Sequence, residues 1–331
     1  MSKNEINQEK FKTMIGGQAL IEGIMMRGPK LDAIVTRSIE GLNVEVTPRK
    51  IRPKNSPLCW PLIRGAVNFF DSQVTGVKAL MRSADLSPEE TEDNPSKLDL
   101  FLEKKLGETK FQSFLIGSAV FLGLGLSILL FFLLPMLIGS IFSVWVNNLL
   151  LQNLLEGVVR ILIFVAYMFL VSRMSEMKRV FAYHGAEHKT IRCYEAGLEL
   201  TVENVRVQTR MHPRCGTSFL LVIMILSILI FSVASSILLA IIPDLQMILG
   251  GVWYRVVMVI YKLLLLPIVV AVGYEINRLV GRYDNWFTRI LTAPGMWFQN
   301  FTTNEPDDKM IEVGIAALTA VLPQTEGDDR W

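Results

Sequence analysis

The chain has 331 residues, of which 51% are hydrophobic, and a formal net charge of only +2. Its mean hydropathy is +0.39, which exceeds ordinary soluble usage, so membrane-embedded segments are expected. The small net charge gives no electrostatic support for a nucleic-acid partner. Three widely spaced cysteines, Cys59, Cys193 and Cys215, exclude a disulfide framework and fit a reducing compartment.

Residues 1–112 are predicted to form a cytosolic N-terminal α+β segment. They begin with a polar stretch that lacks the apolar core of a signal peptide. In residues 14–29 glycines interrupt apolar pairs, which indicates strands and tight turns. Residues 33–39 and 42–47 alternate between polar and apolar types, and they predict two strands joined by a hairpin turn at Glu40 and Gly41.

The rest of this segment is basic, then helical, then acidic. Residues 48–54 are rich in Lys and Arg and predict contact with anionic lipid headgroups. Residues 61–82 carry an apolar residue every three or four positions, so they predict a helix that packs on the hairpin or lies in the membrane interface. Residues 83–99, with two prolines and six acidic residues, predict a flexible linker. The apolar positions of the helix are Ile63, Val67, Phe70, Val74, Val77 and Met81.

Four apolar runs are long enough to cross a hydrocarbon core of about 30 Å at 1.5 Å per residue. Pro135 is expected to kink the continuation of the first run. Glu156 and Arg160 stand four residues apart in the second run, a pair that can neutralise itself or snorkel. Lys262 lies deep in the fourth run and needs a partner. The predicted spans are residues 113–134, 149–172, 218–242 and 252–273, which form two transmembrane domains, 113–172 and 218–273.

Charge predicts the orientation of these spans. The loops at residues 142–149 and 243–251 contain no Lys or Arg, whereas residues 173–214 contain eight. The positive-inside rule therefore places both termini and the central loop, residues 173–217, in the cytoplasm. The predicted fold class is an α-helical polytopic membrane protein with about four transmembrane helices and a small α+β cytosolic part, and membrane lipids are its predicted partners.

The central loop and the C-terminal domain, residues 274–331, have predicted elements of their own. The second span is expected to continue as one helix to about Glu195, where Gly197 caps its end. Residues 198–209 alternate like a strand. Residues 274–301 are aromatic and basic, typical of a helix at the membrane interface. A last helix, residues 305–321, is expected to be capped by Asn304.

All three histidines of the chain lie in two short windows around residues 183–189 and 211–216. On a helix, His184 and His188 project from one face, and Glu187 beside them completes an H-x-x-E-H order, the inverted form of the zinc-protease motif. His212 and Cys215 stand at a spacing that suits a turn presenting both side chains to one ion. These four soft or borderline ligands predict a zinc site.

The sequence leaves the use of this site open. If all four ligands bind, the site is closed and structural, and Glu187 orients a histidine. If His212 or Cys215 stays off the metal, Glu187 becomes the general base that activates water. Glu22, a lone carboxylate in an apolar run, is either a hydrogen-bonded core residue or a second catalytic member. Without a metal, the histidines are hydrogen-bonded, or Cys215 is a nucleophile activated by His212.

Three motifs together resemble the YqhQ-like family of bacterial multi-pass membrane proteins. They are the G-G-Q-A-x-I-E-G-x-M-M-R-G-P opening from Gly16, the Y-H-G-A-E-H-K window and the R-x-H-P-R-C-G-T window. The family is described as a predicted metal-dependent enzyme without an established reaction. The resemblance implies a bacterial plasma-membrane location and gives motif positions to Glu22, Arg27, His184, Glu187, His188, His212 and Cys215.

Two functions of different classes follow from these observations. The first is a cytosol-facing metallohydrolase that uses Glu187 and zinc against a peptide, lipid or phosphate bond. The second is a non-catalytic membrane factor with a structural zinc site, in membrane-protein insertion, translocon association or quality control, with other membrane proteins or the insertion machinery as partners. A transporter is less favoured, because the predicted spans contain few polar groups.

Overall fold

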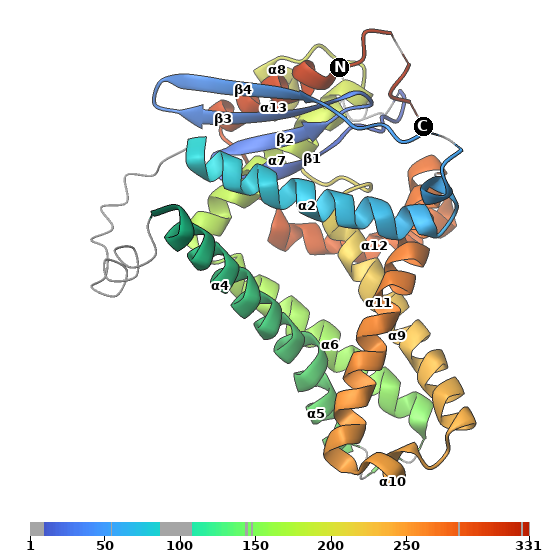
Figure 1. Ribbon diagram of the computed structural model, residues 1–331. Helices are drawn as coiled ribbons and strands as arrows, with labels where there is room; N and C mark the ends of the chain where they lie inside the picture. Colours follow the sequence, from blue (N-terminus) through green and yellow to red (C-terminus); the bar gives the residue numbers. More distant parts are fainter. Residues whose placement is uncertain are drawn as a thin grey trace. The chain divides into compact units, whose positions relative to one another are not determined.

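The structure is a computed structural model that describes residues 10–53, 55–86, 108–142, 145–146, 148–283, 285–325 and 327–330 (Figure 1). The chain forms two compact units. The first unit comprises Met1–Ser87, Tyr167–Ile230 and Leu264–Trp331, and the second comprises Pro88–Ala166 and Phe231–Leu263. The predicted linker falls largely outside the described residues, although the first four of its positions belong to the end of a helix.

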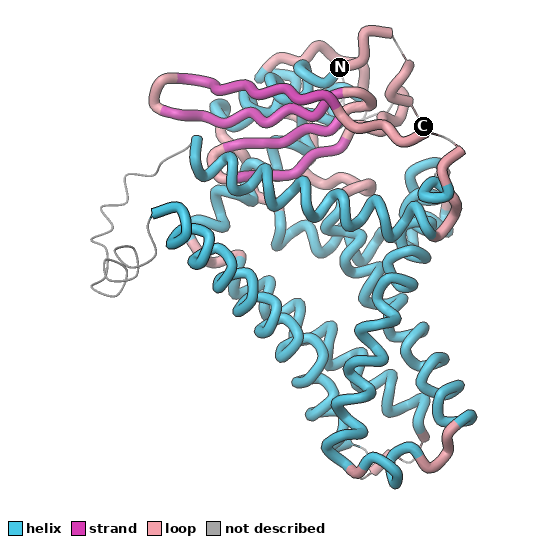
Figure 2. The backbone as a smooth tube through the Cα atoms, viewed as in Figure 1, coloured by secondary structure: helices cyan, strands magenta, loops and turns pink. Residues whose placement is uncertain are grey.

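A four-stranded antiparallel sheet, drawn in magenta in Figure 2, forms the N-terminal part of the first unit. The predicted hairpin between the last two strands is confirmed, and the fold class with its small α+β part is correct. Ser38 pairs with Gly41, so the turn between the last two strands lies at Ile39 and Glu40, one residue before its predicted place. The strands, in spatial order, are β1 (Gly16–Leu20), β2 (Gly23–Arg27), β3 (Leu31–Ser38) and β4 (Gly41–Pro48).

Helices cover both faces of the sheet (Figure 1). Alternation along β2 sends Ile24 and Met26 to a core shared with α7 (Ser175–Glu195) and α13 (Asp308–Val321). Met25 points the other way and packs with Ala79 of α2 (Ile63–Leu86). The first unit is therefore built in layers, with α2 on one side of the sheet and α7 with α13 on the other.

The face that α2 turns to its neighbours consists of small residues and not of the predicted apolar stripe. Gly65, Gly76, Ala79 and Ser83 are buried, and a Cβ atom on Gly76 would lie 2.3 Å from Gln18 Oε1. Small residues allow this close approach. Most of the apolar stripe stays exposed, at Ile63, Phe70, Val74, Val77 and Met81.

The central loop departs from prediction at two points. The second apolar helix, α6 (Leu149–Val171), does not continue into α7, because the backbone of Met174 is extended with ψ 141°. The predicted strand at residues 198–209 is wrong, since α8 (Val202–Arg206) occupies it. Thr201 caps α8 by accepting a hydrogen bond from Asn204 N–H, which satisfies a helix-end donor. The end of α7 at Glu195, followed by Gly197 with φ 62°, is as predicted.

Two helices complete the first unit. Asn285 caps α12 (Trp286–Thr302) in a capping box. The last helix, α13, is capped by Asp307 and not by Asn304. Asn304 instead donates its side-chain amide to the Lys178 carbonyl and its backbone N–H to the Phe181 carbonyl. Several aromatic and apolar side chains in and near α12 are exposed, at Tyr283, Trp286, Phe287, Ile290 and Trp297.

Within the described ranges, four helices are long and apolar enough to cross a membrane. The first runs through Pro135 to Phe142, and the fourth runs to Arg282, so both are longer than predicted. These apolar stretches are Gly117–Phe142, Leu150–Val171, Phe219–Ile241 and Gly251–Arg282. They are formed by α4 (Glu108–Ile128), the π-helix η2 (Leu129–Leu133), α5 (Leu134–Phe142), α6, α9 (Gly216–Ile241) and α11 (Gly251–Arg282), with the short α10 (Leu245–Leu249) before α11.

The second unit contains the three charged residues singled out in the apolar runs. Lys262 Nζ donates to both oxygens of Glu156 at 2.7 and 2.8 Å, and Arg160 Nη2 donates to Glu156 Oε1 at 2.7 Å. All three residues are buried. Glu156 is thus the partner that Lys262 needs, and the cluster carries one negative and two positive side chains.

Candidate metal centre

The helix α7 supplies the two histidines of the H-x-x-E-H motif. Residues 181–191 of α7 are all buried, since the helix packs between the sheet, α13 and the loop at residues 210–215. His184 and His188 stand one turn apart on one face, and their ring centroids are 4.3 Å apart. Gly185 between them permits close packing, because a Cβ atom there would lie 2.0 Å from the Asn304 carbonyl oxygen.

Backbone carbonyls fix both imidazole rings. His184 Nδ1 lies 2.7 Å from the carbonyl oxygen of Thr302, the last residue of α12, and His188 Nδ1 lies 2.6 Å from that of Arg210. A carbonyl can only accept, so each Nδ1 carries a hydrogen, and each Nε2 presents a lone pair whenever its ring is neutral. A carbonyl on the far nitrogen is the usual way to orient a metal-binding histidine. Among the described residues, His188 Nε2 is buried without a hydrogen-bond partner.

Cys215 brings a sulfur atom to the two histidines. Its Sγ lies 3.2 Å from His184 Nε2, and the ligand atoms of His184, His188 and Cys215 all lie within 4.8 Å of one another. The backbone N–H of Thr217 points to the sulfur at 3.4 Å, and Cys215 directly precedes α9, whose N-terminus favours a thiolate. We call His184, His188 and Cys215 the triad.

The residues of the triad shift one another's pKa values. Burial alone would raise the pKa of the Cys215 thiol, but the adjacent His188 and His184 hold it well below its usual range. Burial alone would lower the pKa of His184, but the Cys215 sulfur outweighs this and raises it to about 9. Once His184 Nε2 gives up its proton, the donor set is one anionic sulfur with two neutral imidazoles, which suits a borderline cation such as Zn²⁺.

Glu187 lies beside the triad, and a residue of the sheet holds its carboxylate in place. The Gly17 backbone hydrogen-bonds its carboxylate, and its charge interacts with His184, His188 and Cys215. In the described part of the chain, Oε2 is buried and has no hydrogen-bond partner. Burial raises the pKa of Glu187, with partial opposition from His184 and His188.

His212 lies apart from the triad. Its Nε2 is 3.2 Å from Glu195 Oε2, and its ring centroid is 5.6 Å from that of His188. Glu195 also accepts hydrogen bonds from the Arg214 guanidinium and, at 2.9 Å, from Thr13 N–H. Burial and the nearby Arg214 lower the pKa of His212 well below its usual value. His212 therefore pairs with a carboxylate, and the histidine next to the Cys215 sulfur is His184.

Several residues that hold the centre have no signature in the sequence. The side-chain amide of Gln299 in α12 forms two hydrogen bonds with the backbone of His212. It accepts from the backbone N–H at 2.8 Å and donates to the carbonyl at 2.7 Å. Arg192 Nε donates to the Met211 carbonyl. Backbone carbonyls such as that of Thr302 cannot be read from residue types. Glu195 could have been found, because it stands seven residues after His188 and so shares its helix face.

Glu22 and Arg27 form other contacts. Glu22 sits in the turn between β1 and β2 with φ 48°, and its oxygens accept from Arg179 at 2.5 and 2.6 Å and from the Tyr183 hydroxyl at 3.1 Å. The Arg179 hydrogen bond lowers the pKa of Glu22 against the effect of burial. Arg27 contacts Asp32 and Ser72. Glu22 thus ties the sheet to α7 at Arg179 and at Tyr183, and Tyr183 directly precedes the triad residue His184.

The whole-chain comparisons agree with the motifs. Residues 60–324 match the family described as "Protein of unknown function (DUF1385)". The "Uncharacterized protein YqhQ" of Bacillus subtilis (strain 168) is 31% identical over 324 residues, which cover 96% of this chain and 95% of that protein. No solved structure matches the chain significantly. The extent of both matches shows that the chain belongs to the DUF1385, or YqhQ-like, family.

Proposed function

We propose that this protein is a zinc-dependent hydrolase whose site faces the cytoplasm beside the bacterial plasma membrane. The observation that carries the proposal is a pair of buried acceptors, His188 Nε2 and Glu187 Oε2, that lack partners among the described residues and adjoin the triad. Buried polar atoms of this kind are rare unless an ion or water satisfies them. The arrangement supports a cation at the triad.

Three protein ligands favour a catalytic site over a structural one. A zinc ion here would be held by the three protein ligands His184, His188 and Cys215, whereas structural zinc sites use four protein ligands. His212, the fourth predicted ligand, is engaged by Glu195. A bound zinc ion would supply Lewis-acid activation of water.

The surrounding residues have definable roles in such a reaction. Glu187 is fixed through the Gly17 backbone, so its free Oε2 can take a proton from a water molecule and return it to a leaving group. Thr302 and Arg210 hold the rings of His184 and His188 through their carbonyls. Because residues 181–191 of α7 are buried, the site excludes bulk water.

The membrane location rests on the four apolar helices and on the distribution of basic residues. Residues 173–214 contain eight Lys and Arg residues, and residues 243–251 contain none. The positive-inside rule therefore supports a cytoplasmic triad and cytoplasmic termini.

Burial of the centre supports one competing function, a structural metal site in a non-catalytic membrane factor. His188 is only 1% exposed and Glu187 only 5%, which restricts access by a large substrate. In that case the metal would join α7 to the start of α9 and stabilise a surface for membrane-protein partners or the insertion machinery.

Metal content and hydrolysis separate the two functions. The full-length protein, purified in detergent without a His-tag, is analysed for metals together with Glu187→Gln and Cys215→Ala. We expect about one zinc per chain in the wild type and in Glu187→Gln, and loss of zinc in Cys215→Ala. The exposed Glu203 and the remote Cys59 provide matched controls, Glu203→Gln and Cys59→Ala, which keep the metal.

Hydrolysis is assayed with 4-nitrophenyl esters of carboxylic and phosphoric acids and with casein. We expect Glu187→Gln to lose roughly a hundredfold or more in rate with its zinc retained. Equal rates in Glu187→Gln and Glu203→Gln would rule out Glu187 as the base. Zinc binding without hydrolysis of any probe, with unfolding of Cys215→Ala, would favour the structural site.

A further inference from the structure

A basic groove lies in the first unit next to the loop that carries Cys215. It encloses about 780 Å³ between the segment at Lys10–Lys12, the residues Pro213 and Arg214, the end of α11 and one side of α12. This volume is in the range of small-ligand sites. Five of its lining residues are basic and none of the described lining residues is acidic: the basic ones are Lys10, Lys12, Arg192, Arg214 and Arg289.

The groove offers a ligand the positive charges of Lys10 and Lys12. The Arg214 guanidinium binds Glu195, which is fully buried behind it. Lys10 and Lys12 form no ion pair with any described residue. A concave surface of one sign concentrates ions of the opposite sign.

The place of the groove along the chain matches the depth of lipid headgroups. Val280, in its wall, belongs to the last turn of the fourth apolar stretch, and Tyr283 follows directly. Trp286 and Trp297 of α12 are 74% and 53% exposed, as in the aromatic belts of membrane interfaces. Phe11, Val280 and Met296 add an apolar wall, against which the glycerol and first acyl carbons of a lipid can pack.

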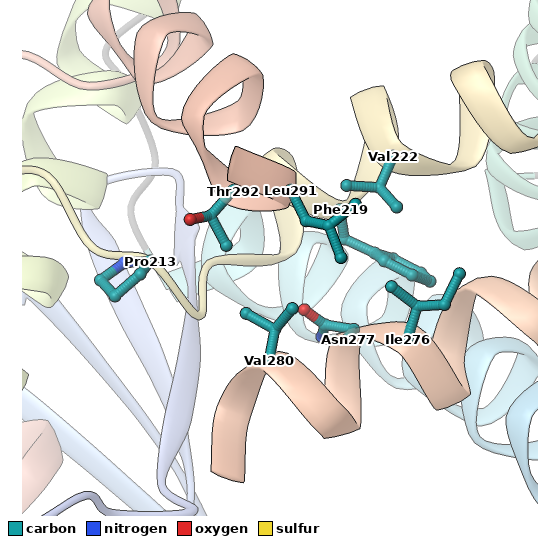
Figure 3. A pocket seen from close by; sticks show the side chains of 8 residues that line it. All are labelled: Pro213, Phe219, Val222, Ile276, Asn277, Val280, Leu291 and Thr292. Carbon is teal, nitrogen blue, oxygen red and sulfur yellow. The ribbon is translucent and has the colours of Figure 1, made fainter. Parts of the chain in front are cut away.

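A second cavity nearby is too small to bind a lipid headgroup. It encloses about 10 Å³ between Pro213, the start of α9, the end of α11 and α12 (Figure 3). That is the space of one water molecule at most. A phosphate-bearing molecule must therefore use the larger groove.

We propose that the basic groove binds a phosphate-bearing anion, with the headgroup of an anionic phospholipid as the ligand of matching shape. Arg side chains bind phosphate oxygens in pairs and Lys side chains bind them as point charges. The inference does not depend on the metal or on hydrolysis. It gives the first unit a phosphate site whose Arg214 is adjacent to the triad residue Cys215 in the chain.

The test uses the full-length protein in detergent and isothermal titration calorimetry. The probes are short-chain phosphatidylglycerol below its micelle concentration, short-chain phosphatidylcholine as its zwitterionic counterpart, and inorganic phosphate. The groove variant is Lys10→Gln/Lys12→Gln. The matched control, Lys178→Gln/Lys309→Gln, removes two exposed charges elsewhere in the first unit, and thermal melting checks that both variants are folded.

We expect phosphatidylglycerol to bind more tightly than phosphatidylcholine, and the groove variant to bind it about thirtyfold more weakly, from the usual effect of two basic side chains on an anionic headgroup. The control should stay within about twofold. Equal binding of inorganic phosphate with the same loss would support the site with free phosphate as its ligand. Absence of binding by every probe, or equal losses in the two double variants, would overturn the proposal.

Discussion

At the scale of single residues, Gly17 shows how the sheet shapes the metal centre. A Cβ atom at this position would lie 2.7 Å from the Met25 carbonyl oxygen and 3.0 Å from Glu187 Cδ. The same residue hydrogen-bonds the Glu187 carboxylate through its backbone. The glycine is therefore needed for the close approach of β1 to Glu187, and not for turn geometry.

Gly17→Ala should displace Glu187 and strain β1. We expect a loss of about 1–3 kcal/mol in unfolding free energy and slower hydrolysis than in the wild type, with zinc retained because the triad is untouched. Thermal or denaturant melting in detergent measures the first effect. Gly16→Ala is the control, because a Cβ atom there meets nothing within 4 Å; equal stability of the two variants would contradict this role of Gly17.

Part of the centre could be predicted from residue spacing alone. Helical periodicity brings His184 and His188 together, and that part needs only the sequence. The contact of Cys215 with His184 is a tertiary contact. The sequence indicated it only through the residue type, because cysteine is a common metal ligand. The position of His212 could not be predicted, because the choice between a metal and Glu195 depends on where the end of α7 meets the loop at residues 210–215.

At the scale of elements, Pro135 and Arg160 explain the π-helix in the first apolar stretch. Proline has no N–H, so it cannot bond the carbonyl four residues earlier, which is that of Phe131. The π-helix η2 lies at residues 129–133, and Arg160 Nε donates to the Phe131 carbonyl at 2.8 Å. The helix is thus locally widened just before Pro135, and a buried arginine satisfies the released carbonyl.

The charge cluster at Glu156 gives a stability prediction for the second unit. Glu156→Gln leaves Arg160 and Lys262 buried without a counter-charge, and removal of one partner of a buried pair costs about 3–5 kcal/mol. Lys262→Met leaves the neutral Glu156–Arg160 pair and should cost much less. Melting temperatures in detergent would compare them. A larger loss in Lys262→Met than in Glu156→Gln would show that Lys262 and not Arg160 is the main partner of Glu156.

Short elements were the ones that the sequence predicted badly. The strand pattern at residues 198–209 failed because α8 has five residues, too few to show a helical period, and its Thr201 cap outweighs the alternation. Asn304 failed as a cap because tertiary contacts with the start of α7 use both its amide and its backbone N–H. The existence of the four long apolar helices and of the hairpin at residues 33–47 was predicted correctly, because these patterns extend over many residues.

At the scale of the whole molecule, the distribution of basic residues predicts a testable orientation. Alkaline phosphatase fused within residues 243–251 should be active, because that loop is expected outside the cytoplasm. A fluorescent protein at the C-terminus should fold and fluoresce. Alkaline phosphatase fused near Glu199, on the opposite side, is the control and should be inactive. The reverse pattern would place the triad outside the cytoplasm and exclude the proposed function as stated.

The layered packing of the sheet has a consequence for biosynthesis. Ile24, Met26 and Val35 are made early, but α13, which covers them, comes almost 300 residues later. The Thr302 carbonyl that orients His184 is also made late. During translation this face of the strands therefore lacks α7 until the second apolar helix has been made, and it lacks α13 until all four apolar helices have been made. Chaperones that cover the exposed strands would protect the growing chain from aggregation over this interval. A metal ion would meet the fully oriented triad only after Thr302 has been made.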